Sequence, residues 1–201
     1  MRWIGIIAAV LLGATWPGET MARDQILEFH PFAGQLRTVN IEINGRVARL
    51  IFDTGAGLTS LTPEFAAAVG CHPRGQVTGF RMDGQRVQFQ RCPDLSIRVG
   101  DEELSRELAV FDLNPILPAG LPQVDGILGL DVFRGRRVTL MAGLAGLRLE
   151  RGRTPSPTGA YEGRMRLATE AGGAGLTVFV FANPDNGGLW LLLDSANLAG
   201  V

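Results

Sequence analysis

The dipeptide Asn44-Gly45 most constrains the fold, because it lies between two segments in which apolar and polar residues alternate. Both residues tolerate the positive φ angles that a two-residue hairpin turn requires. The pattern predicts antiparallel strands over Leu36–Ile43 and Arg46–Phe52. A second hairpin is predicted over Val77–Gln90, with its turn at Asp83-Gly84. Two hairpins in the first half of the chain indicate an antiparallel β architecture.

Glycine and proline support this interpretation. The 201 residues include 27 Gly and 11 Pro, which favours short strands and turns over a helix bundle. The sequence therefore predicts an all-β fold with one or two short helices. One helix is expected after Thr62, with Thr62 as N-cap, Pro63 in the first turn and Gly70 ending it. Further strands are predicted at Leu58–Leu61, Leu95–Val99, Leu108–Leu113, Val138–Met141 and Gly146–Leu149.

Asp53 directly follows the apolar end of the second predicted strand, and Thr54, Gly55, Ala56 and Gly57 come after it. A carboxylate at this position is costly unless it is hydrogen-bonded or used in chemistry. The glycines allow a tight turn and let another group approach the backbone closely. Asp53 is therefore the candidate catalytic residue.

A second motif lies further along the chain, at Asp125-Gly126-Ile127-Leu128-Gly129. Together with Asp53-Thr54-Gly55-Ala56, it makes the chain resemble the bacterial retropepsin-like aspartic proteases of the pepsin and retropepsin clan. The resemblance covers about residues 29–150. It implies a closed β lobe that contributes to hydrolysis of peptide bonds.

The resemblance also implies roles for individual residues. Asp53 would be the catalytic carboxylate, Thr54 would brace two active-site loops, and Gly55 would bring its backbone close to the carboxyl groups. The residues that would support the loop by packing are Ile127, Leu128 and Gly129. The residues at the tip of a substrate-covering flap would be Met82, Asp83 and Gly84. An ordinary surface hairpin is the alternative interpretation of this last segment.

Two positions depart from the retroviral pattern. Retroviral enzymes usually have Asp where this chain has Gly57, and Arg where it has Leu130. Those two charged residues pair with each other in the retroviral form, so their joint loss is coherent. The retroviral substrate and dimer contacts are therefore in doubt, while the chemistry is not.

Aspartic protease chemistry needs two carboxylates that share a proton. Residues 175–182 form a predicted strand, residues 183–188 a turn, and Leu189–Leu193 a second strand that we expect to be buried. Asp194 and Ser195 follow, 141 residues after Asp53 and Thr54 (194 − 53). This succession resembles the opening of a second pepsin-type lobe. Both strands are expected to pair with the first lobe's sheet or with another copy, because exposed apolar edges aggregate.

The source of the second carboxylate stays open in the sequence. Only seven residues follow Asp194 (201 − 194), and Ala196 replaces the usual glycine. The preferred prediction is therefore Asp53 of a second copy in a homodimer. Asp194 itself, or a longer two-lobed protein, is the alternative. The predicted domains are a lobe at 29–150, a linker at 151–163 and a partial second lobe at 164–201.

The first 22 residues are typical of a signal peptide, with Arg2 before an apolar stretch at Ile4–Leu12. Cleavage after Ala22 would give a periplasmic or secreted protein, and an uncleaved N-terminal anchor is the alternative. Export would leave Cys71 and Cys92 in a disulfide-permissive compartment. The sequence leaves open whether they form a disulfide or two buried thiols.

Composition and motifs argue against several other classes of protein function. The net charge of −1 gives no electrostatic basis for binding nucleic acid or an acidic membrane. With two histidines and no other hydrolase motif, no metal or cofactor is predicted. We expect an exported aspartic endopeptidase acting on protein or peptide substrates. The alternatives are a non-catalytic module that binds peptides or a partner, and a truncated pseudo-protease.

Overall fold

The computed structural model describes residues 24–80, 84–141, 143, 145–150, 158–160, 162–182, 185 and 187–196. The predicted signal peptide and the flap-tip residues Met82 and Asp83 lie outside the described residues. So does most of the predicted linker, while Gly84 is described.

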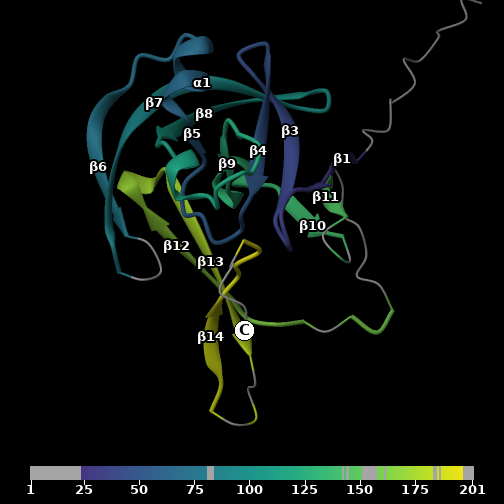
Figure 1. Ribbon diagram of the computed structural model, residues 1–201. Coiled ribbons are helices and arrows are strands. Elements are labelled where there is room, and N and C mark those ends of the chain that lie inside the picture. The colour runs from purple at the N-terminus through teal and green to yellow at the C-terminus, as the bar shows by residue number, and fades with distance from the viewer. Residues whose placement is uncertain are drawn as a thin grey trace, which may run out of the picture.

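Six strands form a closed β-barrel (Figure 1). Neighbouring strands follow the order β3-β4-β9-β5-β8-β7, and pairing between β3 and β7 closes the ring. The strand bounds are β3 (Arg37–Ile43), β4 (Arg46–Phe52), β9 (Gly126–Leu128), β5 (Ser60–Leu61), β8 (Glu102–Val110) and β7 (Arg86–Val99). Two more strands extend the sheet beyond β3 and β7, namely β2 (His30–Pro31) and β6 (Arg74–Phe80). The predicted all-β fold with a closed β lobe is confirmed.

Local turn chemistry sets the first hairpin. Asn44 and Gly45 both have positive φ, at 46° and 78°, and Ile43 pairs with Arg46 across the turn. This is the geometry that the Asn-Gly pair predicts. Apolar side chains of β3 and β4 fill the barrel, with Val39 and Leu50 almost fully buried. The hairpin between β6 and β7 is also formed.

Helix α1 (Pro63–Ala68) begins and ends where the sequence predicts. The Thr62 hydroxyl accepts a hydrogen bond from the Phe65 N–H at 3.3 Å, and Pro63 occupies the first turn. Gly70 follows with φ 77°. Phe65 is buried against the barrel, so the helix packs on the core through one face.

We expect Thr62→Ala to lower the free energy of unfolding by about 1 kcal/mol, because it removes the only side-chain acceptor of the cap. Urea denaturation with an unchanged m-value would measure this loss. Thr62→Ser keeps the hydroxyl and is the matched control. Equal losses in the two variants would contradict a capping role.

A disulfide joins Cys71, just after α1, to Cys92 in β7, with the Cα atoms 5.8 Å apart. The covalent loop between the two cysteines contains β6 and the part of β7 that pairs with β6. The structure thus ties the base of the hairpin that carries the predicted flap to the helix beside it.

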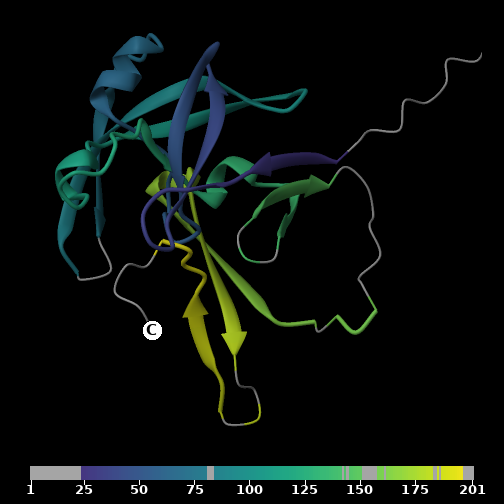
Figure 2. The same ribbon diagram turned by 45° about the vertical axis from the view of Figure 1, so that its right-hand side comes forward.

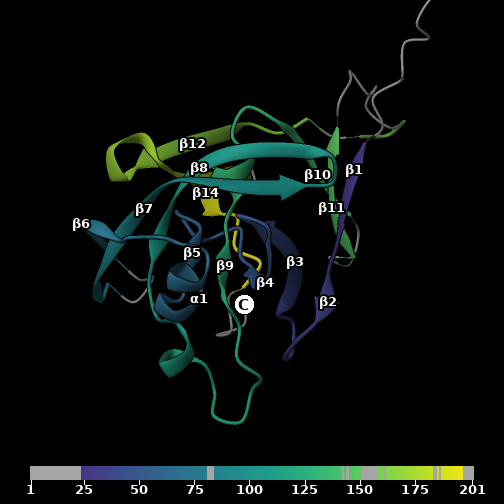
Figure 3. The same ribbon diagram turned by 90° about the horizontal axis from the view of Figure 1, so that it is seen from above.

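Two three-stranded sheets flank the barrel. One lies at its side (Figure 3) and has the order β1-β11-β10. Its strands are β1 (Gln25–Glu28), β11 (Gly146–Glu150) and β10 (Arg137–Leu140). The other has the order β12-β13-β14. Its strands are β12 (Met165–Glu170), β13 (Gly175–Ala182) and β14 (Leu189–Leu192). Short 3-10 helices occur at η1 (Asn114–Ile116), η2 (Leu130–Phe133) and η4 (Ala171–Gly173).

The β13–β14 hairpin forms as predicted but extends away from the barrel (Figures 1 and 2). Its base packs on the core through Leu176, Val178 and Leu193. The prediction that Leu189–Leu193 is buried is wrong for most of β14, since Leu189 is 67% exposed and Leu191 is 48% exposed. Among the described residues, no helix is long and apolar enough to cross a membrane.

The expectation that these strands join the first lobe's sheet is also wrong. The barrel closes on itself through β3 and β7, and β13 and β14 belong to a separate three-stranded sheet. β13 pairs instead with β12 and β14. Pairing with another copy stays a prediction.

Candidate active site

Asp53 lies where β4 leaves the barrel sheet. Strand β4 runs parallel to β9, with Phe52 opposite Leu128. The Asp53 N–H donates to the Leu128 carbonyl at 3.0 Å, and the Gly55 N–H donates to Asp53 Oδ1 at 2.8 Å. The second sequence motif thus holds the Asp53 backbone, and the residue's own loop holds its carboxylate.

A buried carboxylate that the sequence analysis did not single out supports this loop. Asp131 is 3% exposed, and its carboxylate accepts the Thr59 N–H at 3.0 Å and the Thr59 hydroxyl at 2.6 Å. The Thr59 hydroxyl accepts the Gly129 N–H at 2.9 Å. Burial raises the pKa of Asp131, and the hydrogen bonds from Thr59 oppose that rise. A charged residue inside the apolar stretch Leu130–Phe133 was the available signal.

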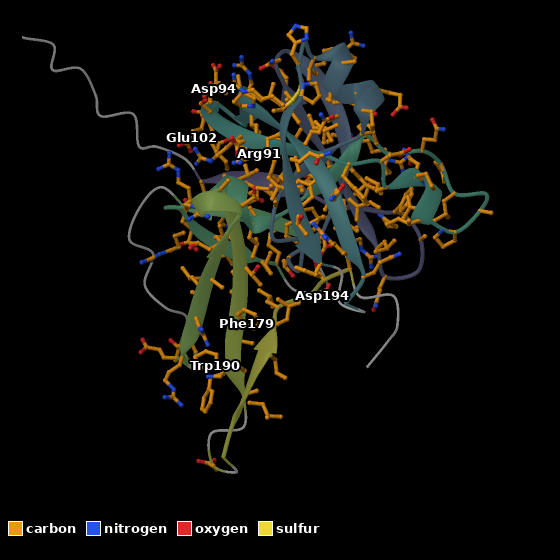
Figure 4. The ribbon with its side chains drawn as sticks, turned by 90° about the vertical axis from the view of Figure 1, so that its left-hand side faces the viewer. Arg91, Asp94, Glu102, Phe179, Trp190 and Asp194 are labelled. Atoms are coloured by element: carbon orange, nitrogen blue, oxygen red, sulfur yellow. A yellow bond between two sulfur atoms is a disulfide. The ribbon has the colours of Figure 1, made fainter. Side chains whose placement is uncertain are left out.

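The loop at Asp194 has the same local geometry as the loop at Asp53. The Ala196 N–H donates to Asp194 Oδ1 at 3.0 Å, as the Gly55 N–H does to Asp53. A methyl group placed on Gly55 would lie 2.9 Å from Cγ of Asp194. Figure 4 shows Asp194 at the end of the hairpin that meets the barrel. The structure therefore brings the Asp194 carboxylate against the Asp53 loop.

Reciprocal hydrogen bonds join the two loops. The Thr54 N–H donates to the Ser195 hydroxyl at 3.0 Å, and the Ser195 N–H donates to the Thr54 hydroxyl at 2.9 Å. The Ser195 hydroxyl also donates to the Phe52 carbonyl at 3.4 Å. Thr54 thus braces two loops, and the second loop belongs to the same chain. The sequence indicates Ser195 only as a hydroxyl residue after Asp194 and predicts no contact for it.

The base of β13 contacts the same loop at Gly57, one of the two positions that depart from the retroviral pattern. The Gly57 carbonyl accepts the Leu176 N–H at 2.6 Å. Arg134 donates hydrogen bonds to the carbonyls of Ala174 and Gly175, and these bonds hold the start of β13. Leu130, the other departure, is buried in the core. Apolar packing and backbone contacts therefore occupy the places of the missing charged pair.

Burial raises the pKa of Asp53 to about 6, from an ordinary value of 3.8. The hydrogen bond from Gly55 opposes this rise, and the negative charge of Asp194 adds to it. A carboxyl group with this pKa holds its proton into the weakly acidic range. Two neighbouring carboxyl groups that differ in protonation can supply both an acid and a base.

The raised pKa predicts a pH-dependent stability. The folded state favours protonated Asp53, so this contribution is fully present below pH 3.8 and is lost as pH rises through about 6. Asp53→Asn removes the titration. The quantity of interest is the free energy of unfolding of the variant minus that of wild type. We expect this difference to be about 2–3 kcal/mol larger at about pH 7.5 than at about pH 3.5. Chemical denaturation at both pH values would measure it, and a constant difference would contradict the raised pKa.

The described residues include no group of three or more His, Cys, Asp or Glu side chains placed to hold a metal ion.

A β-barrel lobe with an Asp-Thr-Gly loop braced by a second Asp-containing loop has the architecture of an aspartic protease. Residues 39–132 match the family model described as aspartyl protease. This segment is therefore similar to aspartyl proteases, which supports the resemblance stated from the sequence for this part of the chain. The match includes Asp53 and Ile127–Gly129 and ends before Asp194.

Solved structures similar to this chain include two proteases. A retropepsin-like aspartic protease from Rickettsia conorii has 21% identity and a TM-score of 0.38, over 63% of this chain and 89% of that one. The EIAV protease, in complex with the inhibitor HBY-793, has 19% identity and a TM-score of 0.35, over 48% of this chain and 84% of that one. No curated protein matches the sequence.

Proposed function

We propose that the protein is an aspartic endopeptidase whose two catalytic carboxylates, Asp53 and Asp194, belong to one chain. The observation that carries this proposal is the reciprocal pair of hydrogen bonds between Thr54 and Ser195. These bonds set the two Asp loops side by side with matching geometry. Peptide-bond hydrolysis is the reaction that two apposed carboxyl groups sharing a proton support best.

In this mechanism a water molecule lies between the two carboxyl groups. The ionised carboxylate accepts a proton from the water, whose oxygen attacks the carbonyl carbon of the peptide bond. The protonated carboxyl group donates its proton to the carbonyl oxygen. The two groups titrate as a unit, so either can hold the shared proton before the reaction. Backbone donors at Gly55 and Ala196 orient the two side chains.

The contacts of Thr54 favour a dyad within one chain over a dyad of two Asp53 residues. Both the N–H and the hydroxyl of Thr54 are bonded to Ser195. A second copy's Asp53 loop would have to displace the hairpin to make the same contacts. We therefore place the second carboxylate at Asp194, in contrast to the homodimer that the sequence analysis preferred.

We also propose that the enzyme acts outside the cytoplasm. The predicted signal peptide and the disulfide between Cys71 and Cys92 support this location, because disulfides persist in oxidising compartments. The proposed substrates are unfolded proteins or peptides.

The dependence of rate on protein concentration tests the one-chain dyad. We expect the purified protein to cleave an unfolded protein substrate, with a specific activity that does not change on dilution. A pepstatin-like inhibitor should abolish the cleavage, as should Asp53→Asn. A specific activity that falls in proportion to dilution would instead support a dyad shared between two copies. Absence of cleavage over the whole range from acid to neutral pH would contradict the endopeptidase proposal.

A further inference from the structure

The C-terminal hairpin repeats the first hairpin of the barrel in the same register. In β3 and β4, Val39 lies opposite Leu50, and in β13 and β14, Val180 lies opposite Leu191. Each residue of the second pair is 141 positions after its counterpart, as Ser195 is after Thr54. The pairs Ile41–Ala48 and Ala182–Leu189 keep the same offset. The repeat therefore extends from the active-site loop through both strands.

Burial distinguishes the two hairpins. Ala48 and Leu50 are fully buried in the barrel, whereas their counterparts Leu189 and Leu191 are 67% and 48% exposed. Strand β4 has a neighbour on each side, β3 and β9, while β14 is the last strand in the described part of its sheet. The second hairpin thus has apolar residues at the positions that are buried in the first. In the described part of its sheet, however, no further strand lies beside β14 to cover them.

The chemistry of the β14 edge indicates which kind of element it can bind. The Leu193 N–H donates inward to the Val178 carbonyl, so alternation directs the N–H groups of Leu192 and Asp194 outward. In the first hairpin, the N–H group that corresponds to that of Asp194 is the Asp53 N–H. It donates to the Leu128 carbonyl in β9. Natural edge strands usually carry charges or proline, and β14 has neither. Strand β12, at the opposite edge, carries Arg166.

We propose that the outer edge of β14 is a docking site for an uncharged strand of a partner polypeptide, which pairs in parallel as β9 pairs with β4. In the repeated register a glycine would lie opposite Leu191 and aliphatic residues opposite Leu192 and Leu193. Gly126, Ile127 and Leu128 lie opposite Leu50, Ile51 and Phe52 in this way. The docked strand would supply a carbonyl for the Asp194 N–H. Docking itself does not depend on the proposed catalysis.

An end-capped synthetic peptide with the sequence of residues 126–130 is the probe, because it contains the β9 segment that pairs with the first hairpin and carries no charged side chain. It would be titrated into the full-length Asp53→Asn protein, which cannot cleave it by the proposed mechanism, and amide hydrogen exchange would be followed by NMR. We expect at least about tenfold protection of the outward amides of Leu192 and Asp194. The Leu193 amide, already bonded to β13, should change little. Equal protection by a scrambled peptide, or none by the probe, would overturn the proposal.

Two matched substitutions locate the site. Leu191→Lys charges the proposed edge, and Met165→Lys charges a residue of similar exposure, 62%, on β12 at the opposite edge of the sheet. We expect the first to weaken peptide binding at least about tenfold and the second to leave it unchanged. Equal weakening by both would overturn the assignment to β14. Protection of the same amides without peptide, rising with protein concentration, would assign the edge to a second copy and overturn the partner-strand proposal.

Discussion

Asp194→Asn is expected to lower kcat for peptide hydrolysis at least about 10³-fold, because an amide can neither accept nor supply the shared proton. The substitution keeps the shape of the side chain and its oxygen acceptor for the Ala196 N–H. The hydrogen bonds between Thr54 and Ser195 involve other atoms, so the loop should keep its position. Steady-state kinetics on a chromogenic peptide, with unfolding measured in parallel, would separate lost chemistry from lost structure.

Asp185→Asn is the matched control, since Asp185 is exposed in the turn of the same hairpin. It should retain wild-type kcat. Mixing Asp194→Asn with Asp53→Asn should not restore activity if each dyad is built within one chain. Restored activity would show that hairpins exchange between copies, and full activity of Asp194→Asn alone would place the second carboxylate elsewhere.

Local signals in the sequence were sufficient to predict much of the fold. The Asn44-Gly45 turn and the Thr62 cap depend on the backbone preferences of a few adjacent residues, so the hairpin and the helix could be predicted directly. The β13 strand could also be predicted, because its apolar residues are bounded by glycine and a turn. The pairing of β4 with β9 was not predicted, since the family resemblance implied only that Ile127, Leu128 and Gly129 pack under the Asp53 loop.

The Asp194 loop was harder to assign because its partner lies 141 residues away. The sequence analysis counted Ala196 against a catalytic role, since glycine is usual at that position. In the structure this residue contributes its backbone N–H to Asp194, and alanine provides that group as well as glycine does. The burial of β14 was predicted wrongly for a related reason. An apolar strand is buried only where another element covers it, and the sequence of the strand does not contain that information.

Gly126→Ala is expected to destabilise the barrel by at least about 3 kcal/mol, which is the largest stability effect we predict. Glycine 126 starts β9, between β4 and β5. A Cβ atom at this position would lie 2.0 Å from the Ser60 carbonyl oxygen and 3.0 Å from the Leu61 Cα, both backbone atoms of β5. No rotamer change can relieve a clash with backbone, so β5 or β9 would have to move. A shift of β9 would also disturb the Leu128 carbonyl that holds the Asp53 N–H.

Gly163→Ala is the matched control, because a Cβ atom there would meet nothing within 4 Å. Its free energy of unfolding should stay within about 0.5 kcal/mol of wild type. Urea denaturation of both variants would give the comparison, and amide exchange at Asp53 would report whether its bond to β9 weakens. Equal stability of the two variants would mean that β5 moves at no energetic cost, and the inferred support of the Asp53 loop by a rigid β4–β9–β5 unit would then be wrong. A loss confined to Gly126→Ala, with faster exchange at Asp53, would connect the packing of this glycine to the position of Asp53.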